Sequence, residues 1–500
     1  MIRYSISEIA QLTGGTVSGD TSKIITNFVT DSRHKTVSPD LLFIAIKGKQ
    51  HDGHLFISDL YASGVRCFLV EVLPDTSFPD ATFILVKNSL KAFHKIVAHH
   101  RKSFTIPVIG VTGSNGKTIV KEWLYYLLSD EQSVVRSPKS YNSQIGVPLS
   151  VCLLDAVHEI AVFEAGISEQ GEMENLEAII KPTIGVFTNI GDAHQENFKS
   201  ITHKIEEKSK LFLSSEVVVC SKDEDDVYTV LSHTTKARLF AWSLHDINAQ
   251  LFIESITKDS KQTIISYVSF NQKDSISIPF TDEASIENAI TCLATLLLLG
   301  NGVLKNRHRF TTLPSVAMRL ELKEGRNNTI LINDCYNSDI ESIKIAIDFL
   351  NQQQQFPEKV LILSDIQQSG VSLEQLYATI FSIIKEKGVT KFIGIGPDLY
   401  KFKQTFDTFG DFYFSTENFV EQIPRYKFSN CSILIKGARK FTFELISKEL
   451  EQRLHQTILE INLNAIGDNL NFYKSLLKPD TKIMVMVKAF SYGSGSYEIA

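Results

Sequence analysis

The sequence predicts an α/β protein that contains more than one doubly wound, mostly parallel sheet. Continuous apolar runs at 160–163, 184–187 and 217–219 are typical of parallel strands buried on both faces. Stretches with a helical period separate them. In addition, an apolar strand at 107–111 runs into a glycine-rich turn, and a helical pattern follows at 119–128. A chain of 500 residues has room for about three domains at ~150 residues each.

Four segments follow one another along the chain. Residues 1–103 indicate a mixed α/β domain with short strands, and residues 104–312 a large domain in which strands alternate with helices. Residues 313–453 indicate a second, smaller doubly wound sheet. The expected strands outside the second segment are 42–46, 67–70, 330–332, 360–363, 392–395 and 433–435.

The last segment, 457–500, has a strand at 458–463, a helical pattern and a second strand at 483–487. A strand-helix-strand unit cannot bury a core of its own. This segment is therefore expected to pack on the rest of the chain or to be the start of a domain that is cut short.

Composition excludes several classes of protein. Apolar residues make up 43% and charged residues 22%, as in ordinary globular domains. A net charge of −6 gives no basic footprint for nucleic acid. The longest apolar stretch, 289–299, is shorter than the ~18 residues of a membrane span. Residues 1–5 lack the apolar h-region of a signal peptide, so none is expected. Six scattered cysteines indicate reduced thiols, so a cytoplasmic location is expected.

The glycine-rich turn is the strongest functional signal. It runs Thr112-Gly113-Ser114-Asn115-Gly116-Lys117-Thr118. Glycines let backbone N–H groups converge on an anion, and the helix N-terminus adds its positive end. The lysine would reach the outer phosphates and the threonine would ligate Mg²⁺. A strict P-loop would have glycine where Val111 stands, so the alternative interpretation is a glycine turn that binds no ligand. We favour the interpretation that the loop binds a nucleoside triphosphate.

Polar residues at strand ends supply candidate partners for this loop. Glu164 ends one apolar run and His194 follows another; an oxygen ligand and an imidazole there could hold Mg²⁺ near the terminal phosphate. Alone, each would be a solvated loop residue. Arg319 precedes the third segment and could reach a phosphate, and polar residues follow the strand at 330–332 directly. These are Asp334, Tyr336 and Asn337.

Two further positions carry no clear signal of their own. Lys208 lies in a charged helical stretch where an exposed side chain is expected. Asn288 lies at the start of an apolar helix, where a nucleotide contact and helix capping are equally good explanations.

Together these motifs resemble the Mur ligases, the ATP-dependent amide-bond formers of peptidoglycan synthesis, over about residues 1–450. The loop 112–118 resembles that family's own P-loop variant. Segments 31–33, 47–48 and 51–54 resemble its N-terminal domain for a uridine nucleotide. Segments 141–148 and 334–338 resemble the members that add D-alanyl-D-alanine, and 436–439 fits the C-terminal domain. The implied fold is a mixed α/β N-terminal domain, a doubly wound P-loop domain and a Rossmann-like third domain.

The resemblance also implies roles for individual residues. Lys117, His194, Lys208 and Arg319 would be catalytic, with Thr118, Glu164, His194 and a carbamylated Lys208 holding Mg²⁺. ATP would contact the loop residues 112–118 together with Asn288, Arg319 and Asp334. Ser32, Arg33, Asn142, Tyr336 and Asn337 would bind UDP-N-acetylmuramoyl-tripeptide or D-alanyl-D-alanine. Two departures weaken details: Ala284-Ser285 replaces a His-Asn pair, and 364–370 departs from a third-domain motif.

The tail resembles the start of the alanine racemase family. Segments 459–466 and 487–495 carry the likeness, with Lys488 implied as the Schiff-base lysine of pyridoxal phosphate and Tyr492 near its phosphate. Phe490 and Ser494 depart from the usual aspartate and histidine, and a surface lysine is the alternative for Lys488. A (β/α)₈ barrel needs about 250 residues, so only its first elements would be present. We expect this chain to have no racemase activity; a complete racemase would dimerise.

The resemblance implies that ATP phosphorylates the tripeptide carboxylate and that the amine of D-alanyl-D-alanine then attacks the acyl phosphate. Another Mur ligase and folylpolyglutamate synthase are the alternatives of the same class, and the segment at 31–33 argues against the latter. A nucleotide-gated, non-catalytic module that regulates a fused racemase is the alternative of a different class. The presence of Glu164, His194 and Lys208 together favours catalysis.

Overall fold

The structure, a computed structural model, describes most of the chain and divides it into two units. One unit is Met1–Phe104 with Cys152–Asp155 and Leu454–Ala500, and the other is Thr105–Val151 with Ala156–Arg453. The predicted boundary at 312/313 falls inside the second unit, so the domain limits stay a prediction. The described residues are 2–33, 38, 40–48, 51–191, 197–259, 262–300, 303–316, 319–336, 338–353, 355–366, 371–406, 409–452, 461–478, 481–486 and 488.

The first unit is built on a five-stranded sheet in the order β2-β7-β6-β5-β4. Only β2 runs antiparallel to its neighbour, and alternate side chains of the sheet pack against α2. The predicted strand 67–70 is confirmed as β6, and 42–46 is found as β5, Leu41–Ile44. The other elements are β1 Tyr4–Ser5, α1 Ile6–Thr13, β2 Thr16–Ser18, β3 Ile24–Ile25, β4 Asn27–Val29, η1 Gly53–Phe56, α2 Ile57–Ala62, β6 Cys67–Val70, β7 Thr82–Leu85 and α3 Ser89–Arg101.

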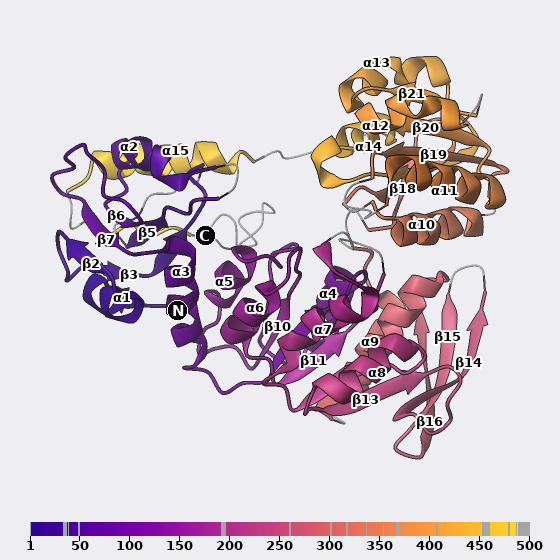
Figure 1. Ribbon diagram of the computed structural model, residues 1–500, viewed down its shortest axis with the longest axis horizontal. Helices are drawn as coiled ribbons and strands as arrows, with labels where there is room; N and C mark the ends of the chain where they lie inside the picture. Colours follow the sequence, from indigo (N-terminus) through magenta and orange to yellow (C-terminus); the bar gives the residue numbers. More distant parts are fainter. Residues whose placement is uncertain are drawn as a thin grey trace. The chain divides into compact units, whose positions relative to one another are not determined.

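A nine-stranded sheet in the order β16-β15-β14-β13-β12-β11-β8-β10-β9 organises the first part of the second unit (Figure 1). Strand β8 lies inside it, with Ile109 and Val111 facing the core that α4 and α9 complete. Gly110 points to the other face, where an added Cβ would meet Pro182 and Leu211. The strands are β8 Val108–Thr112, β9 Val134–Arg136, β10 Ile160–Glu164, β11 Ile184–Phe187, β12 Val217–Ser221, β13 Arg238–Ser243, β14 Leu251–Lys258, β15 Thr263–Ser269 and β16 Gln272–Ile278.

The helices of this part are α4 Lys117–Leu128, α5 Gly146–Val151, α6 Glu172–Ile180, α7 Ile201–Ser209, α8 Asp225–Thr234 and α9 Glu283–Leu299, with 3-10 turns η3 Lys210–Phe212 and η4 Val303–Thr312. The expectation that strands alternate with helices throughout 104–312 is wrong at one edge. There β14, β15 and β16 follow one another as antiparallel neighbours. Two-residue alternation such as Thr263 buried, Ile264 exposed and Ile265 buried suits a sheet edge that is covered on one face only.

The remaining part of the second unit has a six-stranded sheet in the order β17-β18-β22-β19-β20-β21, smaller than the first as predicted. Helices α10 and α11 pack on one face, and α13 and α14 on the other (Figure 1). All strand pairs but β17·β18 are parallel. The elements are β17 Glu321–Gly325, β18 Thr329–Asp334, α10 Ile340–Gln352, β19 Glu358–Ser364, α11 Leu373–Glu386, β20 Lys391–Ile395, α12 Pro397–Lys401, η5 Lys403–Phe406, β21 Asp411–Tyr413, α13 Thr416–Tyr426, β22 Cys431–Lys436, η6 Arg439–Phe441 and α14 Glu444–Leu450.

The tail does not form the expected start of a barrel in its described residues. The helical pattern is confirmed as α15, Leu463–Ser475. Its apolar side chains Leu463, Phe472, Tyr473 and Leu476 are exposed. The strand expected at 483–487 is wrong over 483–486, which form neither helix nor strand. Of the strand expected at 458–463, residues 458–460 lie outside the described residues, 461 and 462 form no strand, and 463 already begins α15.

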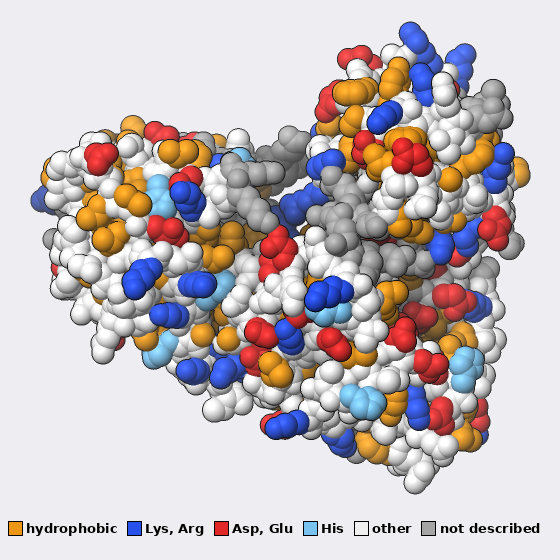
Figure 2. All heavy atoms as spheres, in the orientation of Figure 1, with side chains coloured by type: hydrophobic (Ala, Val, Ile, Leu, Met, Phe, Trp, Pro, Cys, Tyr) orange, Lys and Arg blue, Asp and Glu red, His pale blue; other side chains and the backbone are white. Residues whose placement is uncertain are grey.

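On the face shown in Figure 2, acidic and basic side chains are interspersed. This distribution fits the nearly balanced charge of the sequence. In the part of the chain that the structure describes, no helix is long and apolar enough to cross a membrane.

Candidate active site

The phosphate loop lies where the sequence places it, between β8 and α4. Gly116 occupies the N-cap position of α4 in the left-handed region, with φ 77°, and no side chain caps the helix. The first N–H groups of a helix have no partner within the helix. Together with the positive end of the helix dipole, they make the first turn of α4 an anion site.

The loop is held in shape from one side by the chain that follows β11. The N–H of Ser114 donates to the carbonyl of Asn189 at 2.8 Å, and the N–H of Asn115 donates to the Oδ1 of Asn189 at 2.8 Å. Thr112 is buried and its hydroxyl donates to the carbonyl of Ala165. Of the seven predicted loop residues, Ser114, Asn115, Gly116, Lys117 and Thr118 line the cavity, whereas Thr112 and Gly113 support it.

Gly116 is required for two separable reasons, which a matched pair of variants tests. A Cβ there would overlap the side-chain amide of Asn288, whereas Gly171, with nearly the same φ of 82°, has open space around it. Gly171→Ala should cost only the left-handed strain of roughly 1–2 kcal/mol. Gly116→Ala should cost ~1–3 kcal/mol more through overpacking and should weaken ATP binding. Thermal unfolding measures the loss of stability, and titration with ATP measures the loss of affinity. Equal effects of the two substitutions would contradict this account of the loop.

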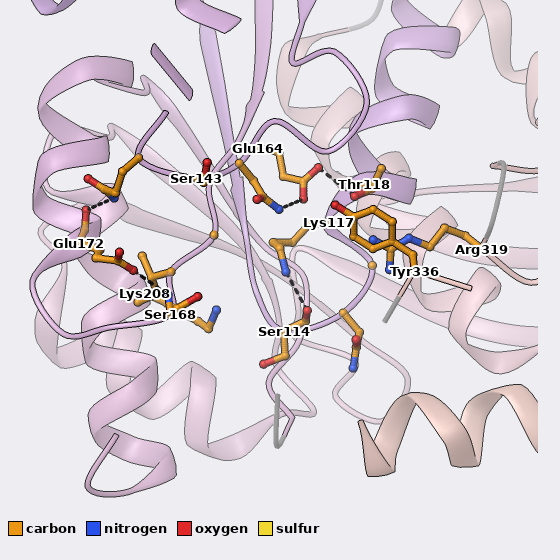
Figure 3. Close-up of a pocket in the computed structure, with 16 residues that line it drawn as sticks. Ser114, Lys117, Thr118, Ser143, Glu164, Ser168, Glu172, Lys208, Arg319 and Tyr336 are labelled. Atoms are coloured by element: carbon orange, nitrogen blue, oxygen red, sulfur yellow. Dashed lines mark hydrogen bonds between the residues drawn. The ribbon is translucent and has the colours of Figure 1, made fainter. Parts of the chain in front are cut away.

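Glu164 and Thr118 meet on the opposite side of the loop (Figure 3). Glu164 is the last residue of β10, as predicted, and is buried. Its Oε2 accepts a hydrogen bond from the Thr118 hydroxyl at 2.9 Å, and its Oε1 accepts one from the Asn142 amide at 2.7 Å. Two of the four predicted metal ligands are thus neighbours, and Asn142, predicted to bind substrate, orients the carboxylate.

Two lysines converge on the carbonyl of Gly113. Lys117 Nζ donates to it at 2.9 Å and to the Ser114 carbonyl at 2.7 Å, and Lys208 Nζ donates to it at 2.9 Å. The expectation of an exposed Lys208 is wrong, because α7 turns Lys204 and Lys208 to the protein interior. The two residues are four apart and so lie on the same face of the helix. Burial, and then Lys117 and Lys204, lower the pKa of Lys208 well below its usual value. Burial also lowers the pKa of Lys117.

Arg319 and Tyr336 complete the cavity from the third segment. The Arg319 guanidinium lies over the Tyr336 ring, 4.1 Å from its centroid, and both residues line the cavity of about 260 Å³ that contains Lys117, Glu164 and Lys208. A guanidinium stacked in this way keeps its edge N–H groups for an anion. The predicted cation for the phosphates is therefore brought to the loop.

The other residues predicted to contact ATP are placed differently. Asp334 ends β18 and forms a buried ion pair with Lys436, Nζ to Oδ2 2.7 Å. It is not among the residues that line the cavity, so the geometry does not support its predicted ATP contact. Asn288 is the sixth residue of α9, which Asp282 caps. Capping by Asn288 is excluded, and its side chain packs against Gly116.

The remaining predicted site residues lie elsewhere or cannot be placed. Ser32 and Arg33 line a separate cavity of about 470 Å³ in the first unit, where Arg33 Nη2 pairs with Asp31 at 2.7 Å. Lys488 is exposed, and the described tail residues do not assemble a pocket for pyridoxal phosphate around it. His194, Asn337 and Tyr492 lie outside the described residues.

Among the described residues, Thr118 and Glu164 are suited to hold a magnesium ion of the kind that enzymes of phosphoryl transfer use. No group of three or more His, Cys, Asp or Glu side chains forms a ready cage in the described part of the chain. Mg²⁺ is instead usually bound by one or two carboxylates together with substrate phosphates and water. The adjacent oxygens of Thr118 and Glu164, next to the anion-binding turn, are such a set.

Sequence reasoning missed several residues of the cavity. Gln144, Ser168 and Glu172 line it. Gln144 Nε2 donates to the Glu172 carbonyl, and the Glu172 carboxylate accepts the N–H of Ser168 at 2.7 Å. The only signal was that Gln144 lies within the segment 141–148 noted for its motif, because nothing in the sequence shows that α6 begins beside the loop.

Comparison with known proteins defines the class of fold. Residues 111–296 match the family model of the Mur ligase middle domain. The chain is similar to a crystal structure of MurF from Acinetobacter baumannii, with a TM-score of 0.79 and 22% identity, over 90% of this chain and 99% of that one. MurF from Thermotoga maritima in complex with ADP is similar with a TM-score of 0.71 and 22% identity, over 85% and 96%. The chain has the three-domain Mur ligase fold.

The chain is also similar in sequence to two curated relatives that carry the same name. The chain is 27% identical over 465 residues to the UDP-N-acetylmuramoyl-tripeptide–D-alanyl-D-alanine ligase of Buchnera aphidicola, covering 90% of this chain and 98% of the relative. It is 28% identical over 386 residues to the enzyme of the same name from Bacillus subtilis, covering 75% and 81%.

Proposed function

We propose that this chain is the ATP-dependent ligase that joins D-alanyl-D-alanine to UDP-N-acetylmuramoyl-tripeptide in the synthesis of peptidoglycan precursors. One observation carries the proposal: Lys117, Thr118, Glu164, the buried Lys208 and Arg319 line a single cavity. The relatives named above, which are similar over most of their length, supply the particular substrates. A cytoplasmic location agrees with this proposal and stays a prediction.

The chain's part in the reaction is to bind, orient and neutralise. The first turn of α4 and Lys117 hold the phosphates of ATP, and Arg319 approaches from the third segment, so that positive charge surrounds the transferred phosphoryl group. Mg²⁺, when bound, would supply further neutralisation of the negative charge on phosphate and substrate carboxylate. Thr118 and Glu164 provide oxygens for it, and Asn142 fixes the rotamer of Glu164.

Lys208 serves this arrangement as a carbamate. Burial, together with Lys117 and Lys204, lowers the pKa of Lys208 and so favours the neutral amine, the form whose nitrogen bonds to the carbon of CO₂ with loss of a proton. The product is an anion with two oxygens. Its charge is compensated by Lys117 and Lys204, the same groups that disfavour a charged Lys208.

The reaction then proceeds in two steps, and neither forms a covalent bond between substrate and enzyme. A tripeptide carboxylate oxygen attacks the terminal phosphorus, and ADP leaves. The dipeptide amine attacks the resulting acyl phosphate, loses a proton and displaces inorganic phosphate. The resemblance of the tail to alanine racemase, which would supply D-alanine, rests on its sequence motifs alone, and the described residues add no support for pyridoxal phosphate.

We expect phosphate release only when ATP, UDP-N-acetylmuramoyl-tripeptide and D-alanyl-D-alanine are all present. The amine is needed because its attack on the acyl phosphate releases the phosphate. Without the amine, an acyl phosphate that is shielded from water is not hydrolysed and keeps its phosphate. Measuring phosphate with each component left out in turn tests this. Release at the same rate without the dipeptide would favour a nucleotide-gated module over a ligase, and release with another amino acid in its place would favour a different Mur ligase.

A further inference from the structure

A second, larger cavity adjoins the phosphate cavity. Its volume is about 740 Å³, within the range of about 300–1,000 Å³ typical of small-molecule sites. It shares Thr118, Arg319 and Tyr336 with the first cavity. A molecule bound in it would therefore have direct access to the phosphoryl group that Lys117 and Arg319 hold.

The second cavity carries charges of both signs for which the described residues provide no ion-pair partner. Lys139, Arg319 and Arg439 line it and make no ion pair with any described residue, whereas Arg136 is paired with Glu122 at 2.9 Å. Glu444 also lines it. The Oε2 of Glu444 is buried and accepts no hydrogen bond from any described group. Such an atom carries a desolvation cost unless a ligand supplies the donor.

Lys139 is held at the cavity by a strained and anchored backbone. Its φ is 49°, a left-handed conformation that few residues other than glycine adopt. Lys121, fully buried, fixes the turn by donating to the carbonyl of Ser137 at 2.9 Å and to that of Lys139. Strain that is maintained in this way is typical of functional positions.

Resting on the proposed function, we infer that this cavity binds the acceptor dipeptide as a zwitterion, with Glu444 taking its α-ammonium and Lys139 its carboxylate. A ligand with one charge would leave either the buried Glu444 oxygen or the cations without a partner. D-Alanyl-D-alanine carries both charges and small methyl groups, which suit the aromatic walls formed by Tyr125 and Tyr126. Arg319 and Tyr336 remain on the side of the phosphate.

Kinetics of two variants test the inference. Glu444→Gln and Lys139→Met should each raise KM for D-alanyl-D-alanine at least ~10-fold, because charge-assisted hydrogen bonds are about twice as strong as neutral ones. KM for ATP should not change. Wild-type enzyme should have a higher KM for D-alanyl-D-alaninamide, which lacks the carboxylate, and Lys139→Met should lose this preference. N-acetyl-D-alanyl-D-alanine, which lacks the ammonium, should compete poorly with the dipeptide.

Glu449→Gln is the matched control. Glu449 lies on α14, like Glu444, but its carboxylate pairs with Arg326 at a half-exposed site. The KM of this variant for D-alanyl-D-alanine should therefore stay within ~2-fold of the wild-type value. If Glu444→Gln lowers the unfolding temperature, the inference is judged from two other results. These are the KM of Lys139→Met and the comparison of D-alanyl-D-alanine with D-alanyl-D-alaninamide. Ligation by the wild type with an unchanged KM for the dipeptide in both variants would overturn the inference and leave the proposed function standing. If the wild type forms no amide at all, the proposed function fails and the inference with it.

Discussion

Lys117→Ala should lower the rate of ligation by at least ~10²-fold, as removal of a charge stabiliser at a developing anion does. The Lys117 side chain lies along the loop, with its ammonium at the carbonyls of Gly113 and Ser114. Steady-state phosphate release at saturating ATP measures the effect. Because burial lowers the pKa of Lys117, the charged form is lost at a lower pH than in an exposed lysine, and kcat/KM for ATP should fall on the alkaline side.

Lys236→Ala is the control for this variant, since Lys236 is exposed in the same part of the chain. Its activity and unfolding temperature should match the wild type. If Lys117→Ala kept more than about a tenth of the activity, the phosphate loop would not hold the reacting phosphate, because a lost charge at that position costs more than ~1.4 kcal/mol.

Lys208→Ala should abolish ligation and regain part of its activity when a short carboxylate such as acetate is added. An ammonium beside a bound cation would repel it, whereas a carbamate or an added carboxylate offers oxygen. Lys208 lies inside the structure at the Gly113 carbonyl, so its removal leaves room for a small anion. Removal of dissolved CO₂ should likewise lower the activity of the wild type, and bicarbonate should restore it.

Lys210→Ala is the matched control, two residues further along. The Lys210 ammonium pairs with Glu207 and Glu174, which raise its pKa and so disfavour the neutral amine that carbamate formation needs. We expect near wild-type activity and no response to acetate. Full activity of Lys208→Ala would remove this lysine from the site, and an equal response of both variants to acetate would make the rescue nonspecific.

The sequence predicted those parts of the site that follow from local order along the chain. A strand, a glycine turn and a helix in succession can place Lys117 and Thr118 in only one way. Glu164 was predicted because it directly follows a buried apolar run, and β10 does pair with β8 in parallel. In such a sheet, polar residues at the carboxyl ends of neighbouring strands lie together.

The features that sequence reasoning missed depend on contacts between distant segments. The Asp334–Lys436 pair arises because β18 and β22 are neighbours, although about a hundred residues separate them. The burial of Lys208 depends on how α7 packs under the loop, and its charged surroundings at 206–210 suggest the opposite. The antiparallel edge β14–β16 was missed because the strand-and-helix alternation was extended into a region whose own period is two.

Transfer of oxygen from the tripeptide to phosphate tests the central claim, ATP-driven ligation through an acyl phosphate, most directly. UDP-N-acetylmuramoyl-tripeptide labelled with ¹⁸O in its free terminal carboxylate is incubated with ATP, Mg²⁺ and D-alanyl-D-alanine, and the phosphate is analysed by mass spectrometry. The account predicts one ¹⁸O in each phosphate formed, since one carboxylate oxygen stays in the amide and the other leaves with phosphorus. Formation of ADP and unlabelled phosphate would contradict it.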